Sequence, residues 1–336
     1  MPASAVSSPG QPPSRTVIAA IRTPTRVVVQ RWTVATLVAN AVIILTGGLV
    51  RLTGSGLGCP TWPRCTPESF VPHRELGAHG VIEFSNRMLT YVLIAVVLAT
   101  VVVVWRWVGS SRSLRWHVGL LAFGVPFQGV IGGISVLTDL NPWVVGLHLI
   151  FSMVLVAAST WLVLRVRASA ASAAEMAAGT EAGAHDGRQR GLAVAAYVLT
   201  WAVVYLGTVV TGSGPHAGDA NAPRNGLDPQ LMSHVHAGAV YLLIAITIGY
   251  CLRTRGTRLL RAGVVLLVVE LAQGAIGLVQ YYTDLPVALV AAHLVGAALL
   301  VAASTRLLLA SYASPATAPA PRQPRNRTDR TDRVAR

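Results

Sequence analysis

Residues 128–148, QGVIGGISVLTDLNPWVVGLH, return 145 residues later as residues 273–293, QGAIGLVQYYTDLPVALVAAH. Each copy runs from an apolar segment through a Thr-Asp-Leu turn into a second apolar segment that carries a histidine. A further match, Thr-Gly-Ser-Gly, begins at Thr53 and again at Thr211, 158 residues later. Self-similarity at such long spacing is typical of a duplicated architecture. The sequence therefore predicts two related halves.

The segments around these copies are membrane-like in composition. Of the 336 residues, 53% are hydrophobic and only 12% are charged, which favours a membrane protein over a soluble one. Spanning about 30 Å of hydrocarbon takes roughly 20 apolar residues. Runs of suitable length cover 33–51, 80–105, 116–137, 143–164, 191–211, 231–252, 262–281 and 287–310. The predicted fold class is an all-α polytopic membrane protein with eight transmembrane helices, arranged as two pseudo-symmetric four-helix bundles.

The basic residues predict the orientation. The net charge is +14, but the arginines lie in loops and tails and form no folded basic face, so nucleic acid is not an expected partner. Arginine-rich loops follow the second and sixth spans, which places these loops and both termini in the cytoplasm. The predicted organisation is a basic cytoplasmic arm (1–31), an N-terminal bundle (32–165), a flexible cytoplasmic linker (166–190), a C-terminal bundle (191–312) and a disordered basic cytoplasmic tail (313–336).

Histidines lie at one depth in the predicted spans. His148, His236 and His293 each lie within about two turns of the outward end of a span, where ionisable groups are costly and often functional. Facing histidines hold heme inside four-helix bundles. We expect His236 and His293 to form a bis-histidine heme site. In the N-terminal half, His148 is the repeat equivalent of His293, but the position equivalent to His236 is Asn86. This predicts that one axial position of an iron bound there is open or weakly filled.

Polar residues share one face of the second span. His79, Glu83, Asn86 and Arg87 follow a helical spacing. Glu83 is the main catalytic candidate, since a carboxylate at the apolar boundary can transfer protons or stabilise a cation. A structural ion pair between Glu83 and Arg87 is the alternative. Glu270, near the middle of the seventh span, is a rival acid whose depth favours a structural polar network.

Two cysteines lie in the first outward loop. Cys59 and Cys65 flank the sequence PTWPR. Thiol pairs on an oxidising face commonly form disulfides, whereas a metal site would need ligands beyond the nearby His73. We expect a Cys59–Cys65 disulfide, and both a structural and a redox-active role remain open.

Two motifs resemble those of the heme A synthase family, here in an actinobacterial-like variant. The run GGLVRLTGSGLGCP at 47–60, continuing to Cys65, is similar to the family's signature, and IEFSNR at 82–87 resembles its catalytic segment. The resemblance covers residues 32–310. It implies a membrane-bound, heme-dependent oxidoreductase that oxidises the C8 methyl of heme O to a formyl group by successive hydroxylations. The product, heme A, would serve cytochrome c oxidase assembly.

The resemblance also implies residue roles. It implies a heme b cofactor on His236 and His293, and catalysis by Glu83. The substrate heme O would bind in the other half, at His148, Asn86, His79 and Arg87, below a functional Cys59–Cys65 disulfide. Many members have histidine where this chain has Asn86, so His79 is the candidate replacement ligand.

Partners and location follow from the same interpretation. We expect heme O, a heme O synthase, an unidentified electron acceptor and membrane lipid as partners, with a homo-oligomer left open. The predicted location is the bacterial plasma membrane, with the heme sites toward the outer face. The alternative functions are a non-catalytic or quinone-linked membrane cytochrome b electron carrier and a transporter, which would need polar residues at the midplane.

Overall fold

The computed structural model describes residues 23–178 and 187–312. Its helices are α2 (Arg26–Leu52), the short 3₁₀ helix η1 (Arg74–Leu76), α3 (Gly77–Arg106), α4 (Arg112–Leu137), α5 (Pro142–Ala178), α6 (Gly187–Ser213), α7 (Pro229–Arg253), α8 (Leu260–Tyr282) and α9 (Val287–Tyr312). Within these ranges there is no strand, and 8 helices are long and apolar enough to cross a membrane. The predicted all-α multi-pass membrane fold is confirmed.

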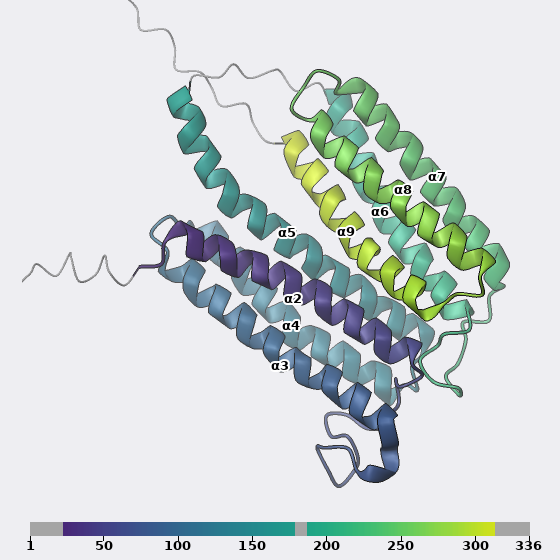
Figure 1. Ribbon diagram of the computed structural model, residues 1–336. Helices are drawn as coiled ribbons and strands as arrows, with labels where there is room; N and C mark the ends of the chain where they lie inside the picture. Colours follow the sequence, from purple (N-terminus) through teal and green to yellow (C-terminus); the bar gives the residue numbers. More distant parts are fainter. Residues whose placement is uncertain (1–22, 179–186, 313–336) are drawn as a thin grey trace, which may run out of the picture.

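Each half is a ring of four helices (Figure 1). In the N-terminal ring α2 packs on α3, α3 on α4, α4 on α5, and α5 on α2; in the C-terminal ring α6 packs on α7, α7 on α8, α8 on α9, and α9 on α6. The rings meet where α5 packs on α6 and α9, and where α2 packs on α9. That the two rings are pseudo-symmetric stays a prediction.

The main apolar cluster inside each ring lies toward one end. We call this the terminus end, because α2 begins and α9 ends there; the opposite end, where α2 ends and α3 begins, is the loop end. The N-terminal core contains Val97, Val104, Val118 and Leu162, and the C-terminal core contains Ala196, Tyr250, Leu266 and Leu307. No residue of α7 before Leu243, and none of α9 before Ala298, is buried. Apolar side chains therefore do not close the loop end of the C-terminal ring.

The repeated Thr-Asp-Leu segments form the same turn twice. Asp139 and Leu140 have φ of 52° and 59°, and Asp284 and Leu285 have φ of 55° and 57°. These left-handed conformations are unfavourable for residues other than glycine. In both turns the leucine N–H donates to a carbonyl five residues back, at 2.8 and 3.1 Å, which satisfies an end carbonyl of the preceding helix. Equal sequence has produced equal local structure in both halves.

The predicted boundaries change at three places. Helix α5 continues to Ala178 and α6 begins at Gly187, so most of the predicted flexible linker 166–190 is helical. The alanine-rich run after Arg167 explains this, because alanine is the strongest helix former. Helix α2 begins at Arg26, inside the predicted arm. The rest of the arm (1–22), the rest of the linker (179–186) and the predicted disordered tail (313–336) lie outside the described residues.

Candidate functional site

His148, His236 and His293 lie at the loop end, each against a glycine of a neighbouring helix. A methyl group added to Gly132 of α4 would lie 3.3 Å from His148 Cε1. On Gly207 of α6 it would lie 3.4 Å from His236 Cε1, and on Gly277 of α8 it would lie 3.5 Å from His293 Cε1. The glycines leave the space that these imidazoles occupy, since no side chain projects from the facing helix.

His236 and His293 approach one another across the C-terminal ring. They belong to α7 and α9, which stand at opposite corners of the ring and share no close packing among the described residues. Their imidazoles are nevertheless close enough to interact electrostatically. In the N-terminal ring Asn86 of α3 and His148 of α5 also occupy opposite corners.

The residues at these corners fit a heme. The Nδ1 atoms of His148, His236 and His293 and the Oδ1 atom of Asn86 are buried without a hydrogen-bond partner. The His236 ring also contacts the Val203 carbonyl. Buried polar atoms without partners are destabilising and call for an explanation. A cofactor in the open loop end of the ring, ligated from two opposite corners, provides one.

A bare metal ion fits the same residues less well. Across residues 23–178 and 187–312 no group of three or more His, Cys, Asp or Glu could hold an ion. Structural zinc sites use four protein ligands, whereas heme iron needs only axial ligands from the protein. Two histidines on opposite helices are a donor set that can supply the axial ligands of heme iron.

Two glutamines fix the helices that carry His148 and His293. Gln128 Nε2 donates to the His148 carbonyl at 3.0 Å, and Gln273 Nε2 donates to the His293 carbonyl at 2.9 Å. Gln128 also donates to Ser152 Oγ. In the sequence these glutamines mark the repeat, and their recurrence 20 residues before each histidine is the signal for this role.

Glu83 is a paired carboxylate at the loop end of α3. Its side chain is buried, and Oε2 accepts a hydrogen bond from the Cys59 N–H at 2.6 Å. Oε1 accepts from Arg87 Nε at 3.1 Å and from Nη2 at 2.5 Å. Both oxygens therefore have partners, and the ion pair that the sequence analysis considered is present.

Arg87 and the disulfide tie the first loop to α3. The Arg87 guanidinium donates to the carbonyls of Cys59, Thr61 and Arg64 at 3.0, 3.0 and 3.1 Å. The predicted Cys59–Cys65 disulfide is confirmed, with both cysteines fully buried. The loop, the acid and the guanidinium thus form one unit, which we call the clasp (Cys59–Cys65, Glu83 and Arg87).

The same loop reaches across the N-terminal ring. The indole of Trp62 lies where a side chain on Gly133 of α4 would project. Gly133 follows Gly132, the glycine that faces His148. Trp62 was not singled out from the sequence, because no local pattern shows that this loop folds back onto α4.

His79 is directed toward the end of α2. Its Nδ1 forms a hydrogen bond with Ser55 Oγ at 2.9 Å. Seven residues separate His79 from Asn86 on α3, about 10 Å along the helix axis at 1.5 Å per residue. His79 therefore lies nearer the membrane surface than the level of Asn86.

Arg51 connects the two rings at the loop end, which the sequence analysis missed. Arg51 Nε donates to the His216 carbonyl at 2.5 Å, and Nη2 donates to the Thr211 carbonyl at 2.9 Å. Nearby, the Gly56 N–H donates to the Gly218 carbonyl at 2.8 Å. The loop after α2 and the loop after α6 are thus docked on each other.

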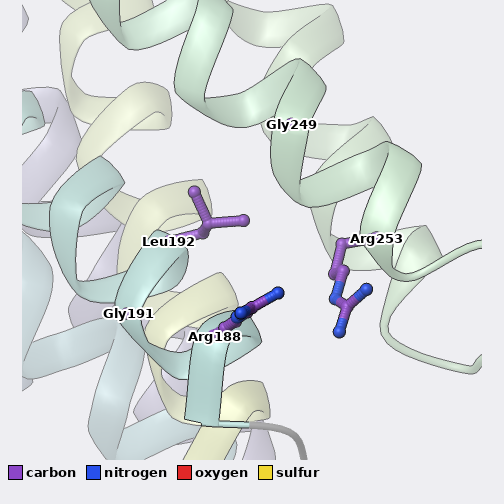
Figure 2. Close-up of a pocket in the computed structure, with 5 residues that line it drawn as sticks. All are labelled: Arg188, Gly191, Leu192, Gly249 and Arg253. Atoms are coloured by element: carbon purple, nitrogen blue, oxygen red, sulfur yellow. The ribbon is translucent and has the colours of Figure 1, made fainter.

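A separate pocket of about 430 Å³ lies at the terminus end (Figure 2). Arg188 of α6 and Arg253 of α7 project toward it from opposite sides. Arg253 is 17 residues beyond His236, about 25 Å along α7. This pocket is therefore not part of the histidine site.

The fold and the site define a class: a multi-pass membrane protein with buried histidine nitrogens on opposite helices of a helical ring. The chain matches the COX15-CtaA family, described as cytochrome oxidase assembly protein, over residues 30–305. It belongs to that family, which confirms the predicted relationship.

Three relatives named heme A synthase illustrate the similarity. The protein of Lysinibacillus sphaericus (strain C3-41) is 35% identical over 130 residues, covering 38% of this chain and 42% of the relative. The proteins of Bacillus pumilus (strain SAFR-032) and Listeria monocytogenes serotype 4b (strain F2365) are 32% identical over 127 residues and 26% identical over 136 residues. Those matches cover 37% and 40% of this chain, and 40% and 44% of the relatives. The matched region thus spans about two fifths of the length of these relatives.

Proposed function

We propose that this protein is a heme A synthase, which oxidises the C8 methyl group of heme O to a formyl group by successive hydroxylations. The observation that carries the proposal is the difference between the rings at one level. The C-terminal ring carries one imidazole with a buried Nδ1 atom on each of two opposite helices, α7 and α9, whereas the N-terminal ring carries one imidazole, an amide and a paired carboxylate nearby. One ring is suited to hold a heme firmly, and the other to hold a heme that must enter and leave.

In the C-terminal ring His236 and His293 would hold heme b. Bound heme b supplies iron that changes its oxidation state by one electron. The chain's own contribution is orientation: Gln273 fixes the backbone at His293, and Gly207 and Gly277 leave room for the two rings. Glu270 lies about one turn further from the loop end than Gln273 on α8. Its Oε1 accepts a hydrogen bond from Thr247 Oγ1 at 2.7 Å, in keeping with a structural polar contact.

In the N-terminal ring heme O would bind with His148 as iron ligand. Asn86 and Arg87 lie on α3, the helix opposite His148 in the ring, and His79 lies on α3 closer to the membrane surface. Glu83 would take up and release the proton of the reacting carbon or oxygen, since a positioned carboxylate is a competent general base. The Cys59 N–H and Arg87 orient this carboxylate, and the clasp limits the access of water from the loop side.

The proposal includes a setting in the cell. The loops at the terminus end are arginine-rich, which supports cytoplasmic termini and heme sites toward the outer face of a bacterial plasma membrane. A heme O synthase would supply the substrate, cytochrome c oxidase assembly would use the product, and a homo-oligomer stays open.

Co-expression with a source of heme O, followed by extraction and chromatography of the pigments, tests the activity. The proposal predicts heme A in cells carrying this chain and none in cells carrying an empty vector. Heme b alone in the purified protein, with no heme A formed from supplied heme O, would instead favour the cytochrome b electron carrier.

A further inference from the structure

A groove of about 330 Å³ lies between α5 and α6, where the two rings meet. Its walls include Trp143, Leu147 and Ile150 of α5 and Trp201, Tyr205 and Thr208 of α6. Its floor is narrow, because a methyl group added to Gly146 would lie 3.2 Å from Thr208 Oγ1. Trp143, Leu147 and Tyr205 are about half exposed, so the groove opens toward lipid.

Three hydrogen-bond donors in this groove lack partners. Among residues 23–178 and 187–312, the indole N–H groups of Trp143 and Trp201 and the phenol of Tyr205 form no hydrogen bond. Buried or lipid-facing tryptophan and tyrosine normally find an acceptor, because an unsatisfied donor in hydrocarbon is costly. The groove therefore fits a ligand that supplies acceptors.

The other polar groups of the groove are already engaged. Thr208 Oγ1 donates to the Tyr205 carbonyl at 2.7 Å, and Asn225 Nδ2 donates to the Val209 carbonyl at 2.9 Å. No charged side chain lines the groove among the described residues. A matching ligand is uncharged, largely apolar and equipped with carbonyl-type acceptors.

The depth of Trp201 distinguishes this groove from an ordinary aromatic belt. Trp201 lies 12 residues before Ser213, the last residue of α6, about 18 Å along the helix from the loop end. Belts of tryptophan and tyrosine lie at the level of the lipid head groups. Trp143, at the loop end of α5, is at belt level, but Trp201 is near the middle of its span.

The groove adjoins both histidine sites. Leu147 immediately precedes His148, and Gly207, which faces the His236 ring, lies between Tyr205 and Thr208. A single helix, about 10 Å across, separates the groove from the interior of each ring. At the loop end the groove reaches Asn225, where water can supply protons.

We propose that this groove binds a quinone, and that the quinone is the electron acceptor of the reaction. Its carbonyl oxygens accept hydrogen bonds from Tyr205 and Trp201, which lie one turn apart on α6, its ring packs against aromatic side chains, and its isoprenoid tail follows the apolar walls. The acceptor role rests on the proposed function. A membrane-dissolved oxidant can reach this groove from the lipid, next to the helices that carry His148 and Gly207.

The chemistry balances with two quinones for each heme. Converting the methyl group to a formyl group breaks two C–H bonds and forms one C=O bond with the oxygen of one water. This releases four electrons and four protons. Each quinone takes two electrons and two protons and leaves as the quinol.

Tryptophan fluorescence of the purified full-length protein tests the binding. Two of the 8 tryptophans line the groove, so decylubiquinone should quench part of the emission in a saturable manner. Decylbenzene, which has the chain but no carbonyl, should not saturate. Ile150→Phe fills the groove and should raise the apparent Kd at least about tenfold. Tyr205→Phe removes one donor and should raise it about threefold or more.

Val154→Phe is the matched control. Val154 lies one turn after Ile150 on α5, is 43% exposed and does not line the groove. The apparent Kd of the Val154→Phe protein for decylubiquinone should therefore stay within about twofold of the value for the unsubstituted protein. Equal quenching curves for the parent, Ile150→Phe and Tyr205→Phe, or saturation by decylbenzene, would overturn the quinone site.

Pigment extraction from the same variants separates this proposal from the proposed function. Ile150→Phe should lower the yield of heme A about tenfold, and Val154→Phe should not. Saturable quinone binding without heme A formation by the parent would overturn the proposed function alone. Full heme A yield from an Ile150→Phe protein that no longer binds quinone would overturn the acceptor role alone.

Discussion

The two rings share their order of helices and their turns but differ at the loop end. In the N-terminal ring the loop after α2 is held down by the clasp, and the corner opposite His148 is Asn86. In the C-terminal ring the residue at the corresponding corner is His236, and no residue of α7 before Leu243 is fully buried. Under the proposed function, tight cofactor binding belongs to the C-terminal ring and substrate turnover to the N-terminal ring, and the rings differ at one corner and one loop.

The largest expected effect is the loss of turnover when Glu83 is replaced. Glu83→Ala and Glu83→Gln should each lower heme A formation by about 10²-fold or more, the range for removal of a general acid or base. Glu83→Gln keeps an acceptor for the Cys59 N–H, so it separates proton transfer from support of the loop. Extracted heme A is the measurement; near-normal yield from Glu83→Gln would leave Glu83 with a structural role only.

Removing the guanidinium should open the clasp. Arg87→Ala leaves Glu83 buried without its charged partner, a change that costs about 3 kcal/mol. That energy corresponds to roughly a 10²-fold larger population of the open loop, and the buried Cys59–Cys65 bond should be reduced by a soluble thiol at a rate raised by about that factor. Arg87→Lys, which keeps the charge but loses the planar fork, should show a smaller increase. Equal reduction rates in all three proteins would show that the guanidinium does not hold the loop.

Asn86→His should make the two rings more alike. A second imidazole opposite His148 would give the heme of the N-terminal ring two axial ligands and should tighten its binding by about tenfold, since each 1.4 kcal/mol of added binding is tenfold. Absorption spectra should show additional six-coordinate heme. Unchanged spectra would mean that residue 86 does not face the iron.

The smallest expected effect is the change in heme binding when a glycine that faces a histidine ring is replaced by alanine. A methyl group at Gly132 would lie 3.3 Å from the His148 ring, closer than the ordinary contact of 3.5 Å at Gly277 and His293. Gly132→Ala should shift that ring by a few tenths of an ångström and weaken heme binding in the N-terminal ring about threefold. Gly277→Ala should change binding by less than about twofold. A heme titration followed by absorbance measures both, and a reversed order would contradict the geometry.

The sequence predicted those features that depend on local pattern. The eight spans, the repeated turns and the Cys59–Cys65 disulfide are all present in the structure. The spans begin earlier at the terminus end, as at Arg112 of α4, because long basic side chains can extend from a helix into the interface.

The remaining features join segments that are distant in sequence. Arg51 meets the loop carbonyl of His216, 165 residues away, and Trp62 packs on Gly133. The groove between α5 and α6 exists only once the two rings are docked. Helical periodicity predicts which face of a helix is apolar but not which helix covers it, so these contacts had no local signal.

The central claim is that the two rings bind heme differently, with both axial ligands in one ring only. Electron paramagnetic resonance of the purified, oxidised protein tests it most directly. The account predicts a low-spin signal from a bis-histidine heme that disappears in His236→Asn and in His293→Asn but persists in His148→Asn. Persistence of that signal after both His236 and His293 are replaced, or its loss in His148→Asn alone, would contradict the account.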